Sequence, residues 1–380
     1  MTRTWDIFCS VVDNFGDIGV CWRLARQLSS ELGQSVRLWV DDVASFQRIC
    51  HAADPARASQ RVGGVEIRRW GVPFPRVALA DVVIEGFGAR LPDAYLEAMA
   101  AQLPHPVWIN LEYLSAESWV EGCHGLPSPH PGLPLVKHFF FPGFTAATGG
   151  LLMESGLAQA RDAFQRDPAA QAAFWRSLGL APADGDALCV SLFCYDNAAL
   201  PALVEAWRAG ATPIVCVVPE GTALAQLSRI AGHAIAPGTN VNLGCLTVRA
   251  IPFLELEQYD RLLWACDFNF VRGEDSFVRA QLAARPLVWQ AYPQQKDAHL
   301  QKLSAFLERY AAGLDADTRA VICAFTEGWN RASADIGRHW PAMRSRRDAL
   351  AAHARNWAGN LAAGGNLAIK LAKFCADRLK

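Results

Sequence analysis

The sequence Val11-Val12-Asp13-Asn14-Phe15-Gly16-Asp17-Ile18-Gly19 joins an apolar run to a helical pattern. The residues before it, 5–12, are mostly apolar, β-branched or aromatic, which predicts a buried first strand of an open sheet. Apolar residues then recur at helical spacing over 18–28, so we expect the strand to lead directly into a helix. Doubly wound folds bind ligands at the carboxyl ends of strands, and Asp13 and Asp17 are therefore candidate functional residues.

The same segment also has a structural interpretation, which the residues alone leave open. Asp13 and Asn14 can form a turn, and Asp17 can cap the helix. Loop glycines beside an acid are a weak motif. A functional assignment therefore needs a second cluster elsewhere in the chain.

The composition is that of an ordinary globular protein. The 380 residues suffice for two domains, and a hydrophobic content of 52% can give each a core. The net charge of −1 argues against a broad surface for nucleic acid or membranes. The 11 cysteines form no Cys-x-x-Cys pair and the histidines lack metal-site spacing, so no bound metal is expected. With no secretion signal and no apolar run of roughly 20 residues, we expect a cytoplasmic protein.

Two successive series of strands and helices predict an α/β fold with two Rossmann-like domains. We expect an N-terminal domain over 1–180, a C-terminal domain over 186–355, and a terminal helix over 356–380 that packs back on the first domain. Residues 124–150, rich in proline and glycine, predict a long loop. Its aromatic residues either fill the space between the domains, which we expect, or form a platform for a ligand. The expected strands cover 36–40, 65–67, 81–84, 107–111, 187–193, 212–219, 246–251, 267–270 and 286–290.

A second polar cluster follows the predicted strand at 267–270. Arg272 offers a planar fork of donors for phosphate oxygens, and the amides of 273–276 begin a predicted helix, where an anion is favoured. Ser276 can add a hydroxyl. Glu274 and Asp275 would repel a pyrophosphate. We therefore expect them to accept hydrogen bonds from sugar hydroxyls, to hold Arg272 or to cap the helix. The alternative is a structural arginine with two capping acids.

Aromatic residues near other strand ends can bind a nucleobase. Phe193 and Tyr195 end the first strand of the second half, and Phe253 follows the 246–251 strand. Gln258 supplies an amide for the edge of a pyrimidine. Rings at loop positions can stack on a base, whereas rings on buried faces belong to the core.

With both clusters in view, the sequence resembles the bacterial protein-arginine rhamnosyltransferases that modify translation elongation factor P, the EarP family. The resemblance covers essentially the whole chain. It implies a GT-B fold of two facing Rossmann-like domains with a cleft between them. It also implies an inverting, metal-independent transfer from dTDP-β-L-rhamnose to an arginine of elongation factor P, with no cofactor besides this donor. The motifs that carry it are Asp13-Asn14-Phe15-Gly16-Asp17-Ile18-Gly19, Ser191-Leu192-Phe193-Cys194-Tyr195 and Arg272-Gly273-Glu274-Asp275-Ser276-Phe277.

This chemistry suggests a role for each cluster. An arginine side chain has a pKa above about 12, so its proton must leave as the bond to the sugar forms. We assign Asp17 as the general base and Asp13 as the group that orients the acceptor. Glu274 acts with them or fixes the donor. Arg272 and the amides of 273–276 stabilise the charge on the leaving diphosphate.

The full donor-binding set extends these clusters. Residues 14–16 are expected over the donor sugar, and Glu112, Tyr113 and Tyr292 are further cleft candidates, each with a structural alternative. The expected donor-binding residues are Asn14, Phe15, Gly16, Asp17, Phe193, Tyr195, Phe253, Gln258, Arg272, Gly273, Glu274, Asp275 and Ser276.

Two other functions remain open at this point. One is a different nucleotide-sugar enzyme on the same fold, such as a transferase to a small molecule or an epimerase. An epimerase would not need an acidic clamp for a cationic acceptor. The other is a non-catalytic module that binds elongation factor P or another protein, which would show no response to dTDP. Nothing in the sequence indicates an obligate oligomer, so we expect a monomer.

Overall fold

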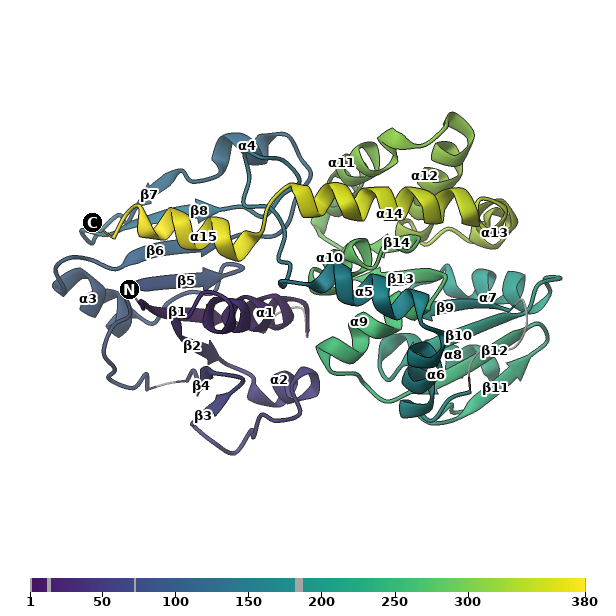
Figure 1. Ribbon diagram of the computed structural model, residues 1–380, viewed down its shortest axis with the longest axis horizontal. Helices are drawn as coiled ribbons and strands as arrows, with labels where there is room; N and C mark the ends of the chain where they lie inside the picture. The colour runs from purple at the N-terminus through teal and green to yellow at the C-terminus, as the bar shows by residue number, and fades with distance from the viewer. Residues whose placement is uncertain (1, 12–14, 72, 182–186, 380) are drawn as a thin grey trace. The chain divides into compact units, whose positions relative to one another are not determined.

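The computed structural model describes residues 2–11, 15–71, 73–181 and 187–379. The chain divides into two compact units (Figure 1). Unit 1 contains Met1–Ser155 and Leu361–Lys380, and unit 2 contains Gly156–Asn360. Each unit is built on one mostly parallel sheet with helices, as the alternation of strands and helices predicts.

Unit 1 holds an eight-stranded sheet in the order β3-β4-β2-β1-β5-β6-β8-β7. The inner pairs are parallel, and the outer pairs β3/β4 and β7/β8 are antiparallel. The strands are β1 (Thr4–Cys9), β2 (Ser35–Val40), β3 (Ser59–Val62), β4 (Val65–Arg69), β5 (Val82–Gly86), β6 (Val107–Leu111), β7 (Pro127–Pro129) and β8 (Val136–Phe140). The helices are α1 (Gly16–Ser30), α2 (Val43–Ile49), α3 (Asp93–Ala101), α4 (Trp119–Cys123) and α15 (Leu367–Ala376).

The first strand and helix follow the sequence pattern closely. In β1 every residue after Thr4 is buried, because parallel neighbours flank the strand on both sides. Helix α1 buries its apolar positions, including Ile18, Leu24 and Leu28. The strand-to-helix connection therefore sits at the carboxyl end of a central strand.

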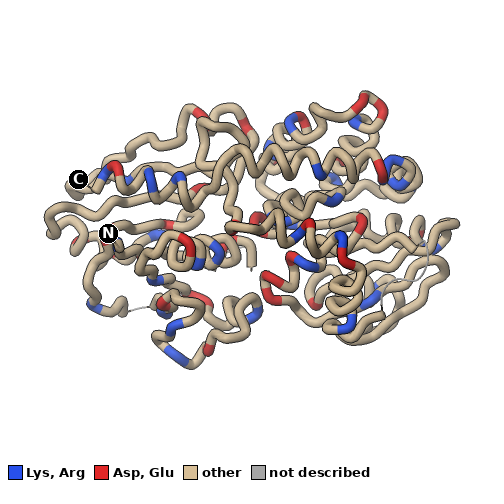
Figure 2. The backbone as a smooth tube through the Cα atoms, in the orientation of Figure 1, with Lys and Arg blue, Asp and Glu red and all other residues tan. Residues whose placement is uncertain are grey.

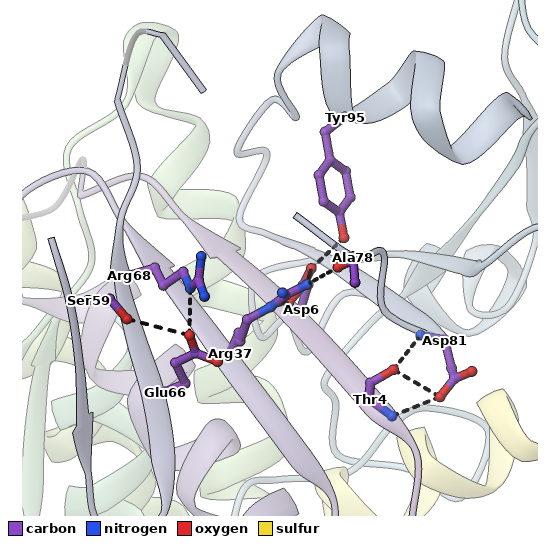
Figure 3. Close-up of polar contacts among 9 residues, drawn as sticks. All are labelled: Thr4, Asp6, Arg37, Ser59, Glu66, Arg68, Ala78, Asp81 and Tyr95. Atoms are coloured by element: carbon purple, nitrogen blue, oxygen red, sulfur yellow. Dashed lines mark hydrogen bonds and ion pairs between the residues drawn. The ribbon is translucent and has the colours of Figure 1, made fainter. Parts of the chain in front are cut away.

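Asp6 lies fully buried in the middle of β1 and ties together three elements (Figure 3). Its two carboxylate oxygens accept hydrogen bonds from Nε and Nη2 of Arg37 on β2, each at 2.6 Å. The hydroxyl of Tyr95 on α3 donates to the same carboxylate. Burial, reinforced by the charge of Asp6, raises the pKa of Tyr95, which keeps this hydroxyl a donor. The cluster is a satisfied ion pair within the core.

Unit 2 holds a six-stranded sheet in the order β11-β12-β10-β9-β13-β14. All neighbours are parallel except β11/β12. The strands are β9 (Leu188–Leu192), β10 (Ile214–Pro219), β11 (Asn240–Leu243), β12 (Leu246–Ile251), β13 (Phe268–Arg272) and β14 (Leu287–Gln290). The helices are α5 (Leu157–Arg166), α6 (Pro168–Ser177), α7 (Leu200–Arg208), α8 (Thr222–Ala231), α9 (Leu256–Ala265), α10 (Asp275–Leu282), α11 (Ala298–Tyr310), α12 (Ala316–Asn330), α13 (Ile336–Ser345) and α14 (Arg347–Ala363), with short 3₁₀ turns at Gln295–Asp297 and Ala311–Gly313. The last turn of α14, from Leu361 onward, is counted with unit 1.

The division between the units lies at Ser155–Gly156 and not at 180–186, where the sequence placed it. Helices α5 and α6 belong to unit 2, because polar side chains of α5 bind carbonyl groups there. Arg161 donates to the carbonyl of Leu282 at 2.8 Å, and Gln165 donates to the carbonyl of Ala283 at 3.0 Å. These bonds satisfy carbonyl groups at the end of α10.

The expected long loop at 124–150 is wrong in part, because it contains β7 and β8. The first part of the aromatic run lies in β8, a strand of the unit 1 sheet. Phe140 of β8 packs edge-on against Phe374 of α15, with ring centroids 5.5 Å apart. Lys370 of α15 also donates to the carbonyl of Thr148 at 2.9 Å. The last helix is thus part of unit 1.

Charged residues of both signs are interspersed along the traces of both units (Figure 2), in keeping with the net charge of −1. No helix among the described residues is long and apolar enough to cross a membrane. Within the same described part of the chain, no group of three or more His, Cys, Asp or Glu is placed to hold a metal ion.

Candidate functional site

The polar residues of unit 2 gather where three neighbouring strands end. Strands β9, β13 and β14 are adjacent and parallel, so their carboxyl ends share one edge of the sheet. Arg272 is the last residue of β13, and its register partner Gln290 is the last residue of β14. This edge is where open α/β sheets bind ligands.

The guanidinium of Arg272 is held by two aromatic rings. Its carbon lies 4.6 Å from the ring centroid of Phe193 and 4.5 Å from that of Tyr195. Arg272 is only 8% exposed. Rings over a guanidinium attract its charge while its N–H groups remain at the edges of the plane. The structure thus brings together three of the residues that the sequence assigns to the donor site.

The turn after β13 carries the acidic residues. Gly273 has φ of 65°, a conformation that glycine adopts without strain, and its carbonyl accepts a hydrogen bond from Trp289 Nε1 at 3.1 Å. Glu274 occupies the N-cap position of α10 but makes no side-chain capping bond. Its carboxylate lies 3.7 Å from the ammonium of Lys302 and is almost fully buried. The side chain of Glu274 therefore does not cap α10, in contrast to the structural alternative.

Ser276 and Asp275 lie buried in the first turn of α10. The hydroxyl of Ser276 donates to the carbonyl of Arg272, four residues earlier. The hydroxyl hydrogen that the sequence assigned to a ligand anion is thus donated to the backbone here. The helix start remains the anion-favouring feature of this segment.

The aromatic set continues on both sides of Arg272. Phe193 packs edge-on with Phe253, with centroids 6.3 Å apart, and Tyr195 packs edge-on with Tyr292 at 5.4 Å. Tyr292 is 49% exposed, so its ring is accessible. Gln258 lies half-buried in the first turn of α9, and its side-chain amide makes no hydrogen bond within the described residues.

The structure adds three residues that sequence reasoning missed. Gln290 accepts a hydrogen bond from the backbone N–H of Tyr195 at 2.9 Å, Trp289 binds the Gly273 carbonyl, and Lys302 pairs with Glu274. Gln290 carried a usable signal, because it is a polar residue ending a buried strand. Lys302 carried none, since it is one of several polar residues on a surface helix.

In unit 1, Asp17 lies in the first turn of α1 and is only 1% exposed. The N-cap position belongs to Phe15, so Asp17 is not the cap that the structural interpretation suggested. The hydroxyl of Tyr113 donates to Oδ2 of Asp17 at 3.4 Å. Tyr113 in turn packs on Phe87, with centroids 4.7 Å apart. The structure thus brings together two of the predicted residues, Asp17 and Tyr113.

The other predicted residues of unit 1 are less closely grouped. Glu112 is half-buried and accepts a hydrogen bond from the side chain of Asn110. Phe15 lies beneath the guanidinium of Arg48, 5.8 Å from it, and Gly16 is the first residue of α1. Asp13 and Asn14 lie outside the described residues.

The cysteines beside the two sites are not poised as nucleophiles. Burial raises the pKa of Cys194 to about 12, although the charge of Arg272 opposes the shift. A hydrogen bond with Cys21, followed by burial and nearby acids that include Asp17, raises the pKa of Cys9. Both side chains are neutral thiols near pH 7, so they contribute packing rather than covalent chemistry.

Comparison with known proteins finds relatives along nearly the whole chain. The family model described as elongation-factor P (EF-P) rhamnosyltransferase EarP matches residues 5–376. The chain is 49% identical over 380 residues to a protein-arginine rhamnosyltransferase of Pseudomonas putida, covering 100% of both chains. It is 48% identical over 379 residues to that of Pseudomonas aeruginosa, covering 99% of this chain and 100% of the relative.

A solved structure leads to the same family. It concerns the basis for EarP-mediated arginine glycosylation of translation elongation factor EF-P, and it matches with a TM-score of 0.72 and 37% identity over 99% of each chain. The α/β architecture is accordingly a GT-B fold, as the family resemblance implied. The chain therefore belongs to the EarP family of protein-arginine rhamnosyltransferases.

Proposed function

We propose that the protein transfers L-rhamnose from dTDP-β-L-rhamnose to an arginine side chain of elongation factor P, with inversion at the anomeric carbon and without a metal ion. The observation that carries the donor assignment is the guanidinium of Arg272, held by the rings of Phe193 and Tyr195 beside the start of α10. The acceptor assignment is supported by the names of the relatives that match the whole chain.

The donor is proposed to bind at the strand ends of unit 2. Its diphosphate would accept hydrogen bonds from the N–H groups of Arg272 and from the amides of 273–276 at the start of α10. Phe253 would stack on the thymine, with Gln258 at the edge of the base. Because the diphosphate gains negative charge as the sugar leaves, the same contacts would stabilise the transition state.

The acceptor arginine is proposed to meet Asp17 and Asp13. A nitrogen of the guanidinium attacks the anomeric carbon, the bond from that carbon to the diphosphate breaks, and the nitrogen loses a proton to Asp17. Asp13 would orient the guanidinium and Tyr113 would orient Asp17, to which its hydroxyl donates at 3.4 Å. Free deprotonation of arginine near neutral pH is out of reach, so a carboxylate must receive the proton during the attack.

Glu274 is proposed to contact the donor sugar. Its carboxylate lies at the start of α10 and is held by Lys302 at 3.7 Å, which leaves it near the predicted diphosphate site without capping the helix. Hydroxyl groups of the sugar would donate to this carboxylate.

Intact-mass spectrometry of elongation factor P tests the whole proposal. After incubation with this protein and dTDP-β-L-rhamnose, we expect the mass to rise by one rhamnosyl group. A variant of the factor whose acceptor arginine is replaced by lysine should not gain mass, and UDP-glucose should not replace the donor. An unchanged mass, when the protein binds dTDP and the factor is folded, would reject elongation factor P as the acceptor.

The proposal also includes a cytoplasmic monomer, since the acceptor is a translation factor and one chain carries both proposed half-sites. Light scattering at working concentration would test the oligomeric state. A mass of two chains in solution would contradict it.

A further inference from the structure

Gln290 occupies a central place in the donor site of unit 2. It is the last residue of β14, it is only 6% exposed, and it stands in register with Arg272 on the neighbouring strand. Its Oε1 accepts a hydrogen bond from the backbone N–H of Tyr195 at 2.9 Å. Tyr195 is one of the two residues whose rings hold the guanidinium of Arg272.

This bond fixes the orientation of the Gln290 amide. A backbone N–H can only donate, so the oxygen of the side chain must face Tyr195 and the NH₂ group must face away. Asn330 of α12 holds the backbone on either side of Gln290, because it accepts from the N–H of Ala291 at 2.9 Å and donates to the carbonyl of Trp289 at 2.7 Å. The amide therefore cannot readily rotate or move away from the strand end.

The NH₂ group of Gln290 has no acceptor within the described residues, which sets it apart from comparable glutamines of unit 2. Gln226 accepts from the N–H of Asn197 at 3.1 Å and donates to its carbonyl at 2.7 Å. Gln281 accepts from Trp357 at 3.0 Å and donates to the carbonyl of Phe277 at 3.3 Å. These two buried amides use both ends, whereas Gln290 uses one.

We propose that the NH₂ group of Gln290 donates a hydrogen bond to a diphosphate oxygen of the nucleotide donor, beside the fork of Arg272. Adjacent register places both residues at the same edge of the sheet, and an anionic oxygen is the acceptor that satisfies a fixed NH₂ donor most strongly. Gln290 is thus a donor-binding residue that also sets the position of Tyr195. This inference rests on the donor site proposed above.

Two substitutions separate the ligand contact from the contact to Tyr195. Gln290→Ala removes both, and Gln290→Glu keeps an oxygen for the N–H of Tyr195 but replaces the donor with an anionic oxygen. We expect calorimetry to show that Gln290→Ala weakens dTDP binding by about tenfold or more, the effect of one hydrogen bond to a charged group. Gln290→Glu should weaken it at least as much, because its charge repels the diphosphate.

Thymidine, which has no phosphate, shows whether Gln290 contacts the diphosphate or the nucleoside part of the ligand. Its affinity, measured by competition with a fluorescent dTDP analogue on the wild type and on Gln290→Ala, should change less than threefold, in contrast to that of dTDP. An equal loss for both ligands would overturn the proposal, because the effect would then come from the loop of Tyr195 or from the base.

Gln226→Glu is the matched control. It keeps the acceptor for Asn197 and loses a donor to the protein backbone, so we expect lower thermal stability with unchanged dTDP affinity. If Gln290→Glu behaves in the same way, with dTDP affinity within twofold of wild type, the NH₂ group does not bind the ligand. A wild-type protein that does not bind dTDP at all would instead reject the donor assignment itself.

Discussion

Replacement of Arg272 by alanine tests the proposed diphosphate site most directly. The side chain is 8% exposed and its guanidinium is fixed by two rings at 4.6 and 4.5 Å, so little side-chain entropy remains to be lost on binding. Hydrogen bonds to a charged group are worth about 1.5–3 kcal/mol each. We therefore expect Arg272→Ala to cost about 2–3 kcal/mol of dTDP binding free energy, which is about 30- to 150-fold in affinity.

Arg272→Lys should give an intermediate loss. Lysine keeps the positive charge but lacks the planar fork and lies less well between the rings of Phe193 and Tyr195. Titration calorimetry measures the dTDP affinity of the wild type, of Arg272→Ala and of Arg272→Lys. Thermal unfolding checks that each of the three proteins is folded. Arg338→Ala is the control, because the side chain of Arg338 is 85% exposed and its partner Asp335 is also at the surface.

The result that refutes this reasoning is an affinity of Arg272→Ala within twofold of wild type. In that case the rings would hold Arg272 for the packing of the sheet edge alone. Arg272→Ala could also lose both dTDP affinity and thermal stability while Arg272→Lys loses neither. The lower affinity would then come from the gap that alanine leaves between the rings.

Three further predictions concern unit 1. Asp17→Asn should lower rhamnosyl transfer to elongation factor P by about 100-fold or more, the scale of a lost general base, while dTDP affinity stays unchanged. Asp6→Asn should lower the free energy of unfolding, measured in urea, by about 3–5 kcal/mol, because it leaves Arg37 without its carboxylate. Burial raises the pKa of Glu85 even though Lys137 opposes the shift, so the folded state binds this proton more tightly than the unfolded state. Wild type should therefore lose stability relative to Glu85→Gln as the pH rises from about 4 to 7.

Each of these has a control and a contrary outcome. Unaltered single-turnover transfer by Asp17→Asn would remove Asp17 from the mechanism. Asp54→Asn breaks an exposed ion pair with Arg57 and should lower the free energy of unfolding by less than about 1 kcal/mol. If Asp6→Asn lowers it by no more than that, burial does not make the ion pair of Asp6 and Arg37 important for stability. A pH-independent stability difference between wild type and Glu85→Gln would show that the proton of Glu85 is not linked to folding.

Most strands of the two sheets could be predicted because they are short, apolar and bounded by polar or glycine-bearing turns. β6, for example, spans the residues expected for it. Strands β7 and β8 were missed because prolines and glycines surround them and β8 is only partly buried. The division between the units was missed because it depends on where α5 finds its hydrogen-bond partners, which a local pattern does not contain.

The residues of the candidate site were predictable where they follow strand ends. Arg272 and Phe193 could be found because each lies at or just beyond the end of a buried strand, and such positions share an edge in a parallel sheet. The contact between Arg272 and the Phe193 ring could not be predicted, because it depends on side-chain rotamers and on the order of the strands. Lys302 lies far from Glu274 in sequence, and only the folded packing of α11 near α10 reveals the pair.

The segment Leu361–Lys380 belongs to unit 1, whose strands all precede unit 2 in the sequence. A nascent chain that stops before Leu361 carries every strand of that sheet but lacks the Phe374 ring that packs against Phe140. Unit 1 is therefore completed only after all of unit 2 has been made. A chain that stops before Leu361 would leave the Phe140 ring without this partner, and apolar surface exposed in this way makes partly folded chains prone to aggregation.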